Sequence, residues 1–139
     1  MRGKASQKPK KLNRRERGVT LGQVRVSIVI PAFNEANYLP KTLGAAHEAR
    51  AALGQAGWAS EVIVCDNNST DDTAAVGRAN GARVVFEPFN QIAASRNAAA
   101  RAARGDWLVF VDADTLVSPM IFREMMRAMA RDDCLGGGC

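Results

Sequence analysis

The chain alternates between short runs of apolar, mostly β-branched residues and longer segments with the composition of helices. Each short run is almost wholly apolar, which is typical of strands that are covered on both faces. These predicted strands lie at residues 26–30, 61–65, 83–86 and 107–111. The intervening segments predict helices at residues 38–53, 70–80, 91–104 and 119–131, with Gly57, Gly81 and Gly105 as stop signals near three of their ends.

This order of elements predicts the fold class. Helices of this length that join successive strands give parallel, right-handed crossovers. We therefore expect an α/β protein with a doubly wound, mostly parallel sheet built from alternating β-α units. Ligands of such sheets bind beyond the carboxyl ends of the strands. Polar clusters follow three of the predicted strands, at residues 34–35, 66–72 and 112–115, and we expect them to converge on one rim.

The size and composition are those of one small globular domain. The chain has 139 residues, of which 47% are hydrophobic and 24% charged, which excludes a disordered or collagen-like chain. The longest apolar stretches are far shorter than the roughly 18 residues that a membrane-spanning helix needs. The N-terminus also lacks the apolar segment of a secretory signal, so we expect a cytoplasmic location.

Charge is concentrated at the N-terminus. Residues 1–18 contain eight basic residues and one glutamate, a net charge of +7, so the rest of the chain is mildly acidic because the whole chain is +5. We expect residues 1–25 to form a basic, disordered tail whose simplest role is a solvated arm. The alternative is a contact with an anionic membrane surface at its cytoplasmic face. No aromatic residues interleave with the charges, so no nucleic acid partner is expected.

The cysteines and the histidine suggest no catalytic or zinc site. Cys65, Cys134 and Cys139 lack the spacing of a zinc site, and Cys65 lies in a predicted strand as a small buried hydrophobe. His47 is the only histidine, and no motif places a serine or cysteine nucleophile beside it. Neither sulfur-based metal binding nor triad chemistry is therefore expected.

A pair of carboxylates follows the fourth predicted strand. Asp112 and Asp114, separated by Ala113, stand where a chain that leaves its strand can turn both carboxylates toward one point. Oxygen ligands of this kind suit Mg²⁺ or Mn²⁺ held together with a substrate diphosphate. An isolated Asp-x-Asp is common in ordinary turns, but the position after a buried strand favours a metal site.

The cluster after the second predicted strand has two interpretations. Ser69 or Thr70 is predicted to cap the following helix, and the aspartates at 71–72 then fall in its first turn, where carboxylates suit the helix dipole. Capping leaves Asp66 and Asn67 without a structural role. Their side chains stand at the mouth of the strand and could read the edge of a nucleobase by hydrogen bonds.

An aromatic and an arginine complete the candidate site. Residues 31–35 end the first strand, and Phe33 could stack on a base there or belong to the core. Arg96 is either a surface charge or a guanidinium that reaches a base or phosphate. The chain has neither a phosphate-binding loop of the GxxxxGK[ST] type nor a GxGxxG after its first strand, which excludes P-loop nucleotidases and dinucleotide dehydrogenases.

Four segments in this order resemble the successive signatures of family 2 glycosyltransferases with the GT-A fold. They are residues 26–35, 62–71, 94–97 and 105–114. The resemblance runs from about Val26 to the C-terminus and implies that residues 26–139 form a Rossmann-like half-domain that binds a nucleotide-diphospho-sugar donor and a divalent metal. It implies transfer of the sugar to an acceptor, with inversion, while Mn²⁺ or Mg²⁺ assists departure of the nucleotide diphosphate.

The resemblance also implies roles for single residues. Phe33 would stack on the base beside the backbone of Pro31, Asn67 would lie at the base edge near Arg96, and Asp112 would lie by the ribose and the metal. Asp114 would ligate the metal, with Asp112 beside it. The substrate-binding residues implied in this way are Pro31, Ala32, Phe33, Glu35, Asp66, Asn67, Arg96, Asp112 and Ala113.

Two departures from the family pattern limit what it implies. Many members have two aspartates where this chain has Asp66 and Asn67, and the second of them reads the N3–H of uracil. An asparagine can accept that hydrogen bond or serve a different base, so the nucleotide is left open. In the family, the acceptor-binding half and the general base come after the last helix found here, so the resemblance places them beyond Cys139. Glu124 and the aspartates at 132–133 look like ordinary helix-surface or helix-end groups. We therefore expect an apparently truncated chain that binds donor and is silent in transfer.

Two alternatives remain beside this interpretation. One is a non-catalytic fragment that binds nucleotide-sugar, or a subunit that depends on a partner. The other is a sugar-phosphate nucleotidyltransferase, which should carry a glycine-rich loop with arginine where this chain has residues 31–35. The sequence leaves the acceptor open among glycans, lipid-linked molecules and small molecules.

Overall fold

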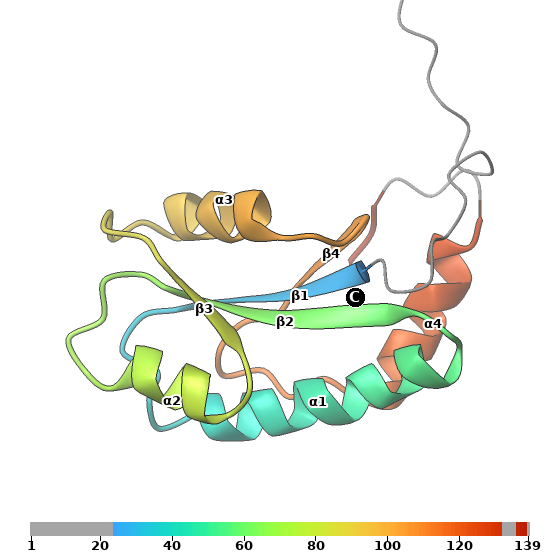
Figure 1. Ribbon diagram of the computed structural model, residues 1–139, viewed down its shortest axis with the longest axis horizontal. Coiled ribbons are helices and arrows are strands. Elements are labelled where there is room, and N and C mark those ends of the chain that lie inside the picture. Colours follow the sequence, from blue (N-terminus) through green and yellow to red (C-terminus); the bar gives the residue numbers. More distant parts are fainter. Residues whose placement is uncertain (1–23, 132–135, 139) are drawn as a thin grey trace, which may run out of the picture.

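The computed structural model describes residues 24–131 and 136–138, and it consists of strands and helices in strict alternation (Figure 1). In the order of the chain, the elements are β1 (Val24–Ala32), α1 (Leu39–Gln55), β2 (Ala59–Asp66), α2 (Thr73–Ala79), β3 (Arg83–Phe86), α3 (Ile92–Ala102), β4 (Trp107–Phe110) and α4 (Pro119–Met129). All four predicted strands and all four predicted helices are present.

The strands form one parallel sheet in the order β3-β2-β1-β4. The inner strand β1 pairs with β2 on one side and β4 on the other, so that Ile28 lies between Val62 and Val109. Strand order runs outward from β1 through β2 and β3, and then returns to the far side of β1 for β4. This reversal creates a switch point between β1 and β4, where doubly wound sheets hold their ligands. The predicted α/β class is confirmed.

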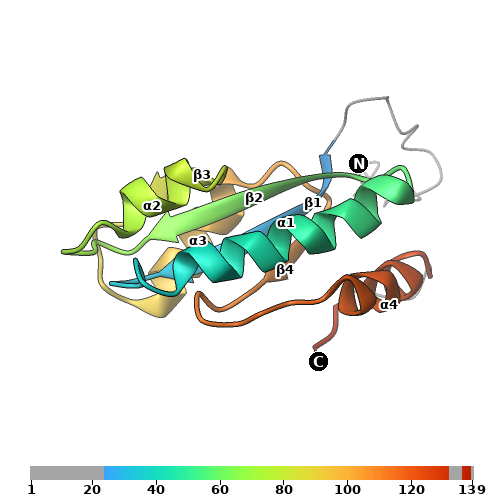
Figure 2. The ribbon, with the colours of Figure 1, turned by 90° about the horizontal axis from the view of Figure 1, so that it is seen from below.

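Helices cover both faces of the sheet, as Figures 1 and 2 show. Helices α1, α2 and α4 lie on one face, and α3 lies alone on the other. Alternate residues of β1 serve the two sides: Ile28 and Ile30 join the larger core with Phe122 of α4, whereas Val29 joins the smaller core with Ala99 of α3. This pattern explains why the centre of β1 is apolar on both faces, since its successive residues meet helices on one face or the other.

The observed boundaries differ most at the second helix. We expected it to begin at residue 70, but α2 begins at Thr73 because the residues before it bind the neighbouring loop. Two of the three predicted stop glycines, Gly57 and Gly81, follow α1 and α2 with φ of 76° and 78°, the left-handed region that glycine adopts readily.

Gly105 has a different role from the predicted stop signal. Its amide nitrogen donates to the hydroxyl of Ser27 over 3.0 Å, and a Cβ at this position would lie 2.7 Å from the Ser27 backbone nitrogen. The chain can therefore enter β4 here only with a residue that lacks a side chain.

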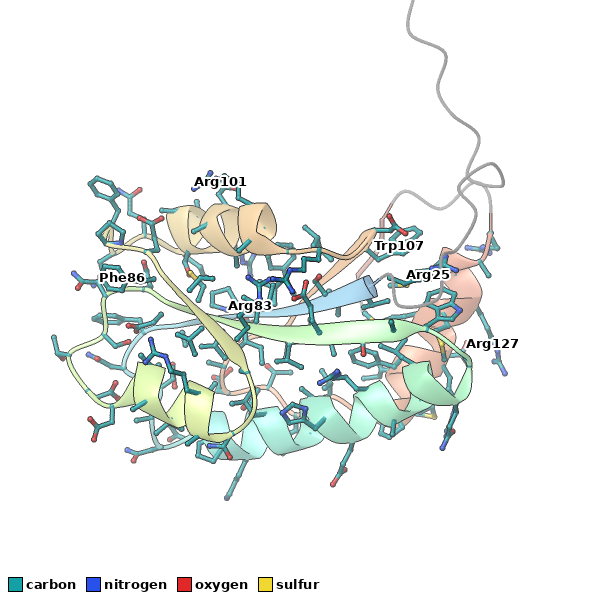
Figure 3. All side chains as sticks on the ribbon, in the orientation of Figure 1. Arg25, Arg83, Phe86, Arg101, Trp107 and Arg127 are labelled. Carbon is teal, nitrogen blue, oxygen red and sulfur yellow. The ribbon has the colours of Figure 1, made fainter. Side chains whose placement is uncertain are left out.

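A carboxylate lies partly buried next to Gly105, near the amino ends of the strands. Glu61 accepts hydrogen bonds from the Ser27 hydroxyl at 2.7 Å, the Arg104 amide nitrogen at 2.7 Å and the Arg83 guanidinium at 2.9 Å. Arg83 also donates to the carbonyl of Ala102 at the end of α3, and Figure 3 shows its side chain between α3 and the sheet. This network joins β1, β2, β3 and the α3–β4 connection.

Other expectations concern single residues. Cys65 is fully buried, as predicted, and burial raises the pKa of its thiol. His47 has a structural contact, 2.8 Å from its Nε2 to the carbonyl oxygen of Asn80. Among residues 24–131 and 136–138, no helix combines the length and the apolar character needed to cross a bilayer. The basic residues 1–18, Cys134 and Cys139 lie outside the described residues.

Candidate functional site

The carboxyl ends of the four parallel strands meet along one edge of the sheet, on the left in Figure 1. Backbone hydrogen bonds continue the pairing past the strand ends. The amide nitrogen of Asn67 donates to the carbonyl of Ala32, and the amide nitrogen of Glu87 donates to the carbonyl of Asp66. The loops that carry the predicted polar residues are therefore held side by side, as expected.

Asn34 ties the loop after β1 to the loop after β2. Its amide nitrogen donates to the Ser69 hydroxyl over 3.0 Å, and its side-chain oxygen accepts from the Thr70 amide nitrogen over 2.8 Å. Asn34 adopts a φ of 53°, a conformation that asparagine tolerates better than most residues. The prediction that Ser69 or Thr70 caps the next helix is wrong, because both are engaged by Asn34.

A second pair of contacts completes this junction. The amide nitrogen of Glu35 donates to the Thr73 hydroxyl over 2.9 Å, and that of Ala36 donates to the Asp71 carboxylate over 3.2 Å. Asp71 also accepts from the hydroxyl and the amide nitrogen of Thr73, and these hydrogen bonds, the hydroxyl first among them, lower its pKa. The aspartates at 71–72 thus precede α2 and do not lie in its first turn, contrary to expectation.

Phe33 stands at the tip of the loop after β1. Phe33 is 42% exposed, while Ala32 before it is buried. The sequence was compatible with a place for Phe33 in the core or with stacking on a base. The structure excludes the core, and the aromatic side chain is accessible at the rim. Pro31 is half-buried at the end of β1, where it pairs in register with Cys65 of β2.

Asp112 and Asp114 follow β4 beside the switch point. Burial alternates through this segment, with Val111 and Ala113 buried and both aspartates exposed. The carbonyl of Ala113 accepts a hydrogen bond from the Thr42 hydroxyl of α1 at 2.5 Å, which fixes the segment against the main core. Both carboxylates are thereby presented to solvent.

Arg96 reaches Asp112 from α3, on the face of the sheet opposite to the core that holds Val109 and Val111. Its guanidinium lies 3.5 Å from the Asp112 carboxylate and 5.6 Å from the ring centroid of Phe110. The side chains of Arg96 and Asp112 are 45% and 65% exposed, so this ion pair contributes little to stability and can be rearranged by a ligand. The structure thus brings together a cation from α3 and Asp112, the first of the two carboxylates that follow β4.

The donor set suits a cation that shares its coordination with a ligand. Within residues 24–131 and 136–138, no group of three or more histidine, cysteine, aspartate or glutamate side chains could enclose a metal ion. The exposed Asp112 and Asp114 therefore offer carboxylate oxygens without a full protein cage. Mg²⁺ is commonly bound in this way, by one or two carboxylates together with substrate phosphates and water.

Asp66 and Asn67 occupy the expected place at the mouth of β2, but their side chains are turned into the protein. They are 6% and 5% exposed. The Asp66 carboxylate accepts from the amide nitrogen of Ser69 over 3.2 Å, and the Asn67 amide contacts the loop between β3 and α3. Both residues thus have structural partners at the rim.

The sequence analysis did not predict several contacts that hold the loops of this rim in place. Asn34 bridges two loops, Thr42 fixes Ala113, and the buried Glu87 accepts from the amide nitrogen of Phe89 over 3.0 Å. An asparagine directly after a strand and a carboxylate at the end of another are the sequence signals for Asn34 and Glu87. Nothing in the sequence pairs Thr42 with a residue 71 positions later.

Curated relatives of this chain are glycosyltransferases and polysaccharide synthases by name. The chondroitin synthase of Pasteurella multocida is 31% identical over 115 residues, which are 79% of this chain and 11% of the relative. The validoxylamine A glucosyltransferase of Streptomyces hygroscopicus is 33% identical over 119 residues, which are 81% of this chain and 27% of the relative. Curated relatives are matched over only 11% to 36% of their own length.

Solved structures share the fold. TarS of S. aureus (residues 1–349) has a TM-score of 0.62 at 22% identity, over 76% of this chain and 32% of that one, which shows the fold alone. The glucosyl-3-phosphoglycerate synthase of Mycobacterium tuberculosis, solved with Mn²⁺, UDP and glucosyl-3-phosphoglycerate, has a TM-score of 0.61 at 25% identity, over 76% of this chain and 39% of that one.

The family assignment rests on the sequence profile of Glycosyl transferase family 2, which matches residues 27–138. That range includes most of β1, the rim loops, the aspartates after β4 and all of α4. Because the match extends over most of the 139 residues, the chain belongs to glycosyl transferase family 2.

Proposed function

We propose that residues 26–139 bind a nucleotide-diphospho-sugar donor for a glycosyltransferase reaction, at the rim beyond the carboxyl ends of β1 and β4. The observation that carries this proposal is the pair of exposed carboxylates, Asp112 and Asp114, at the switch point of the sheet, with the Arg96 guanidinium beside Asp112. A diphosphate needs charge compensation, and this chain has no phosphate-binding glycine loop. A cation on the two aspartates supplies that compensation.

The rest of the rim is suited to the nucleoside. The exposed ring of Phe33 offers a flat apolar surface on which a base can stack. Arg96 already pairs with one acidic group at 3.5 Å and can exchange that contact for a phosphate oxygen or a base. Asp112 would then face the ribose and the cation. The backbone that positions Phe33 belongs to the same short segment as Pro31, Ala32 and Glu35.

Asp114, with Asp112, would hold Mn²⁺ or Mg²⁺. When bound, the metal would act as a Lewis acid that stabilises the departing nucleotide diphosphate. The M. tuberculosis relative solved with Mn²⁺ and UDP supports this choice of cofactor and nucleotide. The part of the relatives' length that this chain does not span would supply the acceptor site and the general base of an inverting transfer.

Calorimetric titration of the 139-residue chain with UDP and with GDP, each with and without Mn²⁺ or Mg²⁺, tests the donor site. We expect saturable binding of a nucleoside diphosphate that requires the divalent cation, since the two carboxylates repel a diphosphate in its absence. Comparison of UDP with GDP identifies the base. Failure of both nucleotides to bind in the presence of metal, or binding that is independent of metal, would contradict the proposal.

The basic tail is the basis of a separate prediction about the location of the protein. Residues 1–18 carry +7 on a segment outside the described residues, and we propose that they contact the anionic cytoplasmic face of a membrane. Vesicles that contain phosphatidylserine should sediment the full chain at low salt and release it as salt rises, because the screening length falls to about 8 Å at physiological ionic strength. A chain that lacks residues 1–18 is the control. If the full chain stays in the supernatant at low salt, the tail is only a solvated arm.

A further inference from the structure

The loop between β3 and α3 is held by two buried polar side chains. Glu87 is 7% exposed and accepts from the amide nitrogen of Phe89 over 3.0 Å. Asn67, at the end of the neighbouring strand β2, is 5% exposed and directs its side-chain amide at the same loop. Phe89 itself is 72% exposed, so backbone groups of the loop, and not the aromatic ring, are what the two buried side chains hold.

Hydrogen bonding decides how the Asn67 amide is oriented. With its nitrogen toward Phe89, the amide donates to the Phe89 carbonyl over 2.6 Å and accepts from the amide nitrogen of Gln91 over 3.2 Å. In the opposite orientation its nitrogen lies 3.3 Å from the side-chain oxygen of Asn90, and its own oxygen faces the Phe89 carbonyl. The first orientation is favoured because it gives both the nitrogen and the oxygen of a buried amide a hydrogen-bond partner. The side chain of Asn90 is exposed, so its own amide group can rotate to suit this orientation.

This pair of contacts reaches the start of α3. Gln91 is the residue that precedes the helix, and its carbonyl accepts the hydrogen bond from the amide nitrogen of Ser95. Arg96 follows one residue later, and its guanidinium pairs with Asp112 across the rim. The position of Gln91 therefore sets where α3 begins and where Arg96 reaches.

We propose that Asn67 is a positioning residue that clamps the β3–α3 loop and so places Arg96 for the nucleotide, and that it does not read the base. The proposal depends on the proposed function only for its effect on nucleotide binding. An amide suits this position because its nitrogen can donate to the Phe89 carbonyl while its oxygen shares the Gln91 amide nitrogen, which also donates to the Phe89 carbonyl over 2.7 Å. An aspartate, which other family members have here, accepts from both sides and would face the Phe89 carbonyl with a second acceptor.

The two roles predict opposite results for Asn67→Asp. A base reader that accepts the N3–H of uracil works at least as well with a carboxylate, so UDP should bind the variant as tightly as the parent chain. A clamp is broken by the carboxylate, and UDP binding in Mn²⁺ should weaken about tenfold at pH 7.5. Acidification to pH 5.5 should restore much of that affinity, because a protonated carboxyl can again donate to the Phe89 carbonyl.

The surroundings of residue 67 favour this recovery. Asp66 on β2 and Glu87 after β3 are its acidic neighbours, and each disfavours a further negative charge, so the pKa of an introduced carboxyl should rise. Arg96, the cation from α3, pairs with Asp112. Ratios of variant to parent affinity at each pH remove the titration of UDP itself from the comparison.

Asn68→Asp is the matched control. It adds the same charge one residue later, on an exposed side chain with a φ of 59° that aspartate tolerates, and should bind UDP within about twofold of the parent chain at both pH values. Tight UDP binding by Asn67→Asp at pH 7.5, or an equal loss of affinity at both pH values, would overturn the clamp.

A measurement on the parent chain without nucleotide keeps the proposal testable if Asn67→Asp does not fold. Nuclear magnetic resonance should show the side-chain NH₂ of Asn67 protected from exchange with solvent in the free protein, and its resonances should shift little on addition of UDP. Rapid exchange of that NH₂ in the free protein would refute the clamp. If the parent chain binds no UDP, the proposed function fails, while this exchange measurement still decides whether the clamp exists.

Discussion

Replacement of Asp114 by asparagine is expected to remove the effect of Mn²⁺ on UDP binding. Loss of a carboxylate from a site with so few protein ligands should lower the affinity for UDP in Mn²⁺ by at least about tenfold, since even loss of an outer-sphere partner of a metal ligand typically costs 10- to 100-fold. Without metal, the same change removes a negative charge near the diphosphate, so the already weak binding should stay the same or improve. The variant should therefore bind UDP equally with and without Mn²⁺.

The fold should survive this substitution, because Asp114 is exposed and the segment is fixed by the contact between Thr42 and the Ala113 carbonyl. Glu48→Gln is a matched control, since it replaces an exposed carboxylate by an amide on α1. Calorimetry of the two variants and the parent chain, with and without Mn²⁺, separates loss of a ligand from a change in net charge. A response to Mn²⁺ in Asp114→Asn equal to that of the parent would contradict the assignment of Asp114.

The largest effect on stability is expected for Glu61→Ala. This change leaves the Ser27 hydroxyl, the Arg104 amide and the Arg83 guanidinium without their shared acceptor, and the side chain of Glu61 is only 14% exposed. Unpaired buried donors cost about 1–3 kcal/mol in such cases. We expect the free energy of unfolding to fall by about 2–3 kcal/mol, a large part of the roughly 5–15 kcal/mol of a typical domain.

The effect of Glu61 should depend on pH. Burial opposes its charged form, but hydrogen bonds from Ser27, the Arg104 amide and Arg83 outweigh burial and lower the pKa below the ordinary value of 4.5. A carboxyl with a lowered pKa in the folded state stabilises the fold above its unfolded pKa, and this contribution is lost as pH falls through the folded pKa. The difference in stability between parent and Glu61→Ala should be constant above about pH 5 and shrink below pH 4.5.

Glu124→Ala is the control for this experiment. Glu124 also pairs with an arginine, Arg127, but both side chains are more than half exposed, so its removal should change the stability by less than about 0.5 kcal/mol. Urea unfolding of the three proteins at pH 7 and at several values down to pH 3 provides the comparison. Equal losses of unfolding free energy in Glu61→Ala and Glu124→Ala, or a difference between them that does not change down to pH 3, would show that the hydrogen-bond network of Glu61 does not stabilise the fold more than a surface ion pair does.

The candidate site was predictable in part. The position of the aspartates after β4 follows from the chain itself, because polar residues directly after an apolar strand of a parallel sheet lie at its carboxyl edge. The exposure of Phe33 does not, because the sequence is also compatible with a place for this residue in the core. The helix caps were not predictable in the same way. Ser69 and Thr70 have the side chains of good caps, but Asn34, 35 residues earlier than Ser69, takes their hydrogen bonds.

Asn67 illustrates the same limit at the candidate site. Its place at the mouth of β2 follows from the end of an apolar run, and its chemistry allows contact with a base. Which way its amide turns depends on the loop between β3 and α3, more than twenty residues later, whose Phe89 carbonyl and Gln91 amide nitrogen face it. A single residue type in a motif therefore cannot distinguish a side chain that reads a ligand from one that holds a loop.

The sequence by itself determined the element order, the parallel α/β class and the edge of the sheet where the site lies. These features depend on local periodicity and on the handedness of crossovers, which neighbouring residues carry. Only the tertiary structure decided the partners of the polar side chains: Glu61 with Arg83, Thr42 with Ala113, and Arg96 with Asp112. Each of these contacts joins residues that are far apart in the chain, and its formation depends on how the strands pair and how the helices pack on the sheet, which no local pattern encodes.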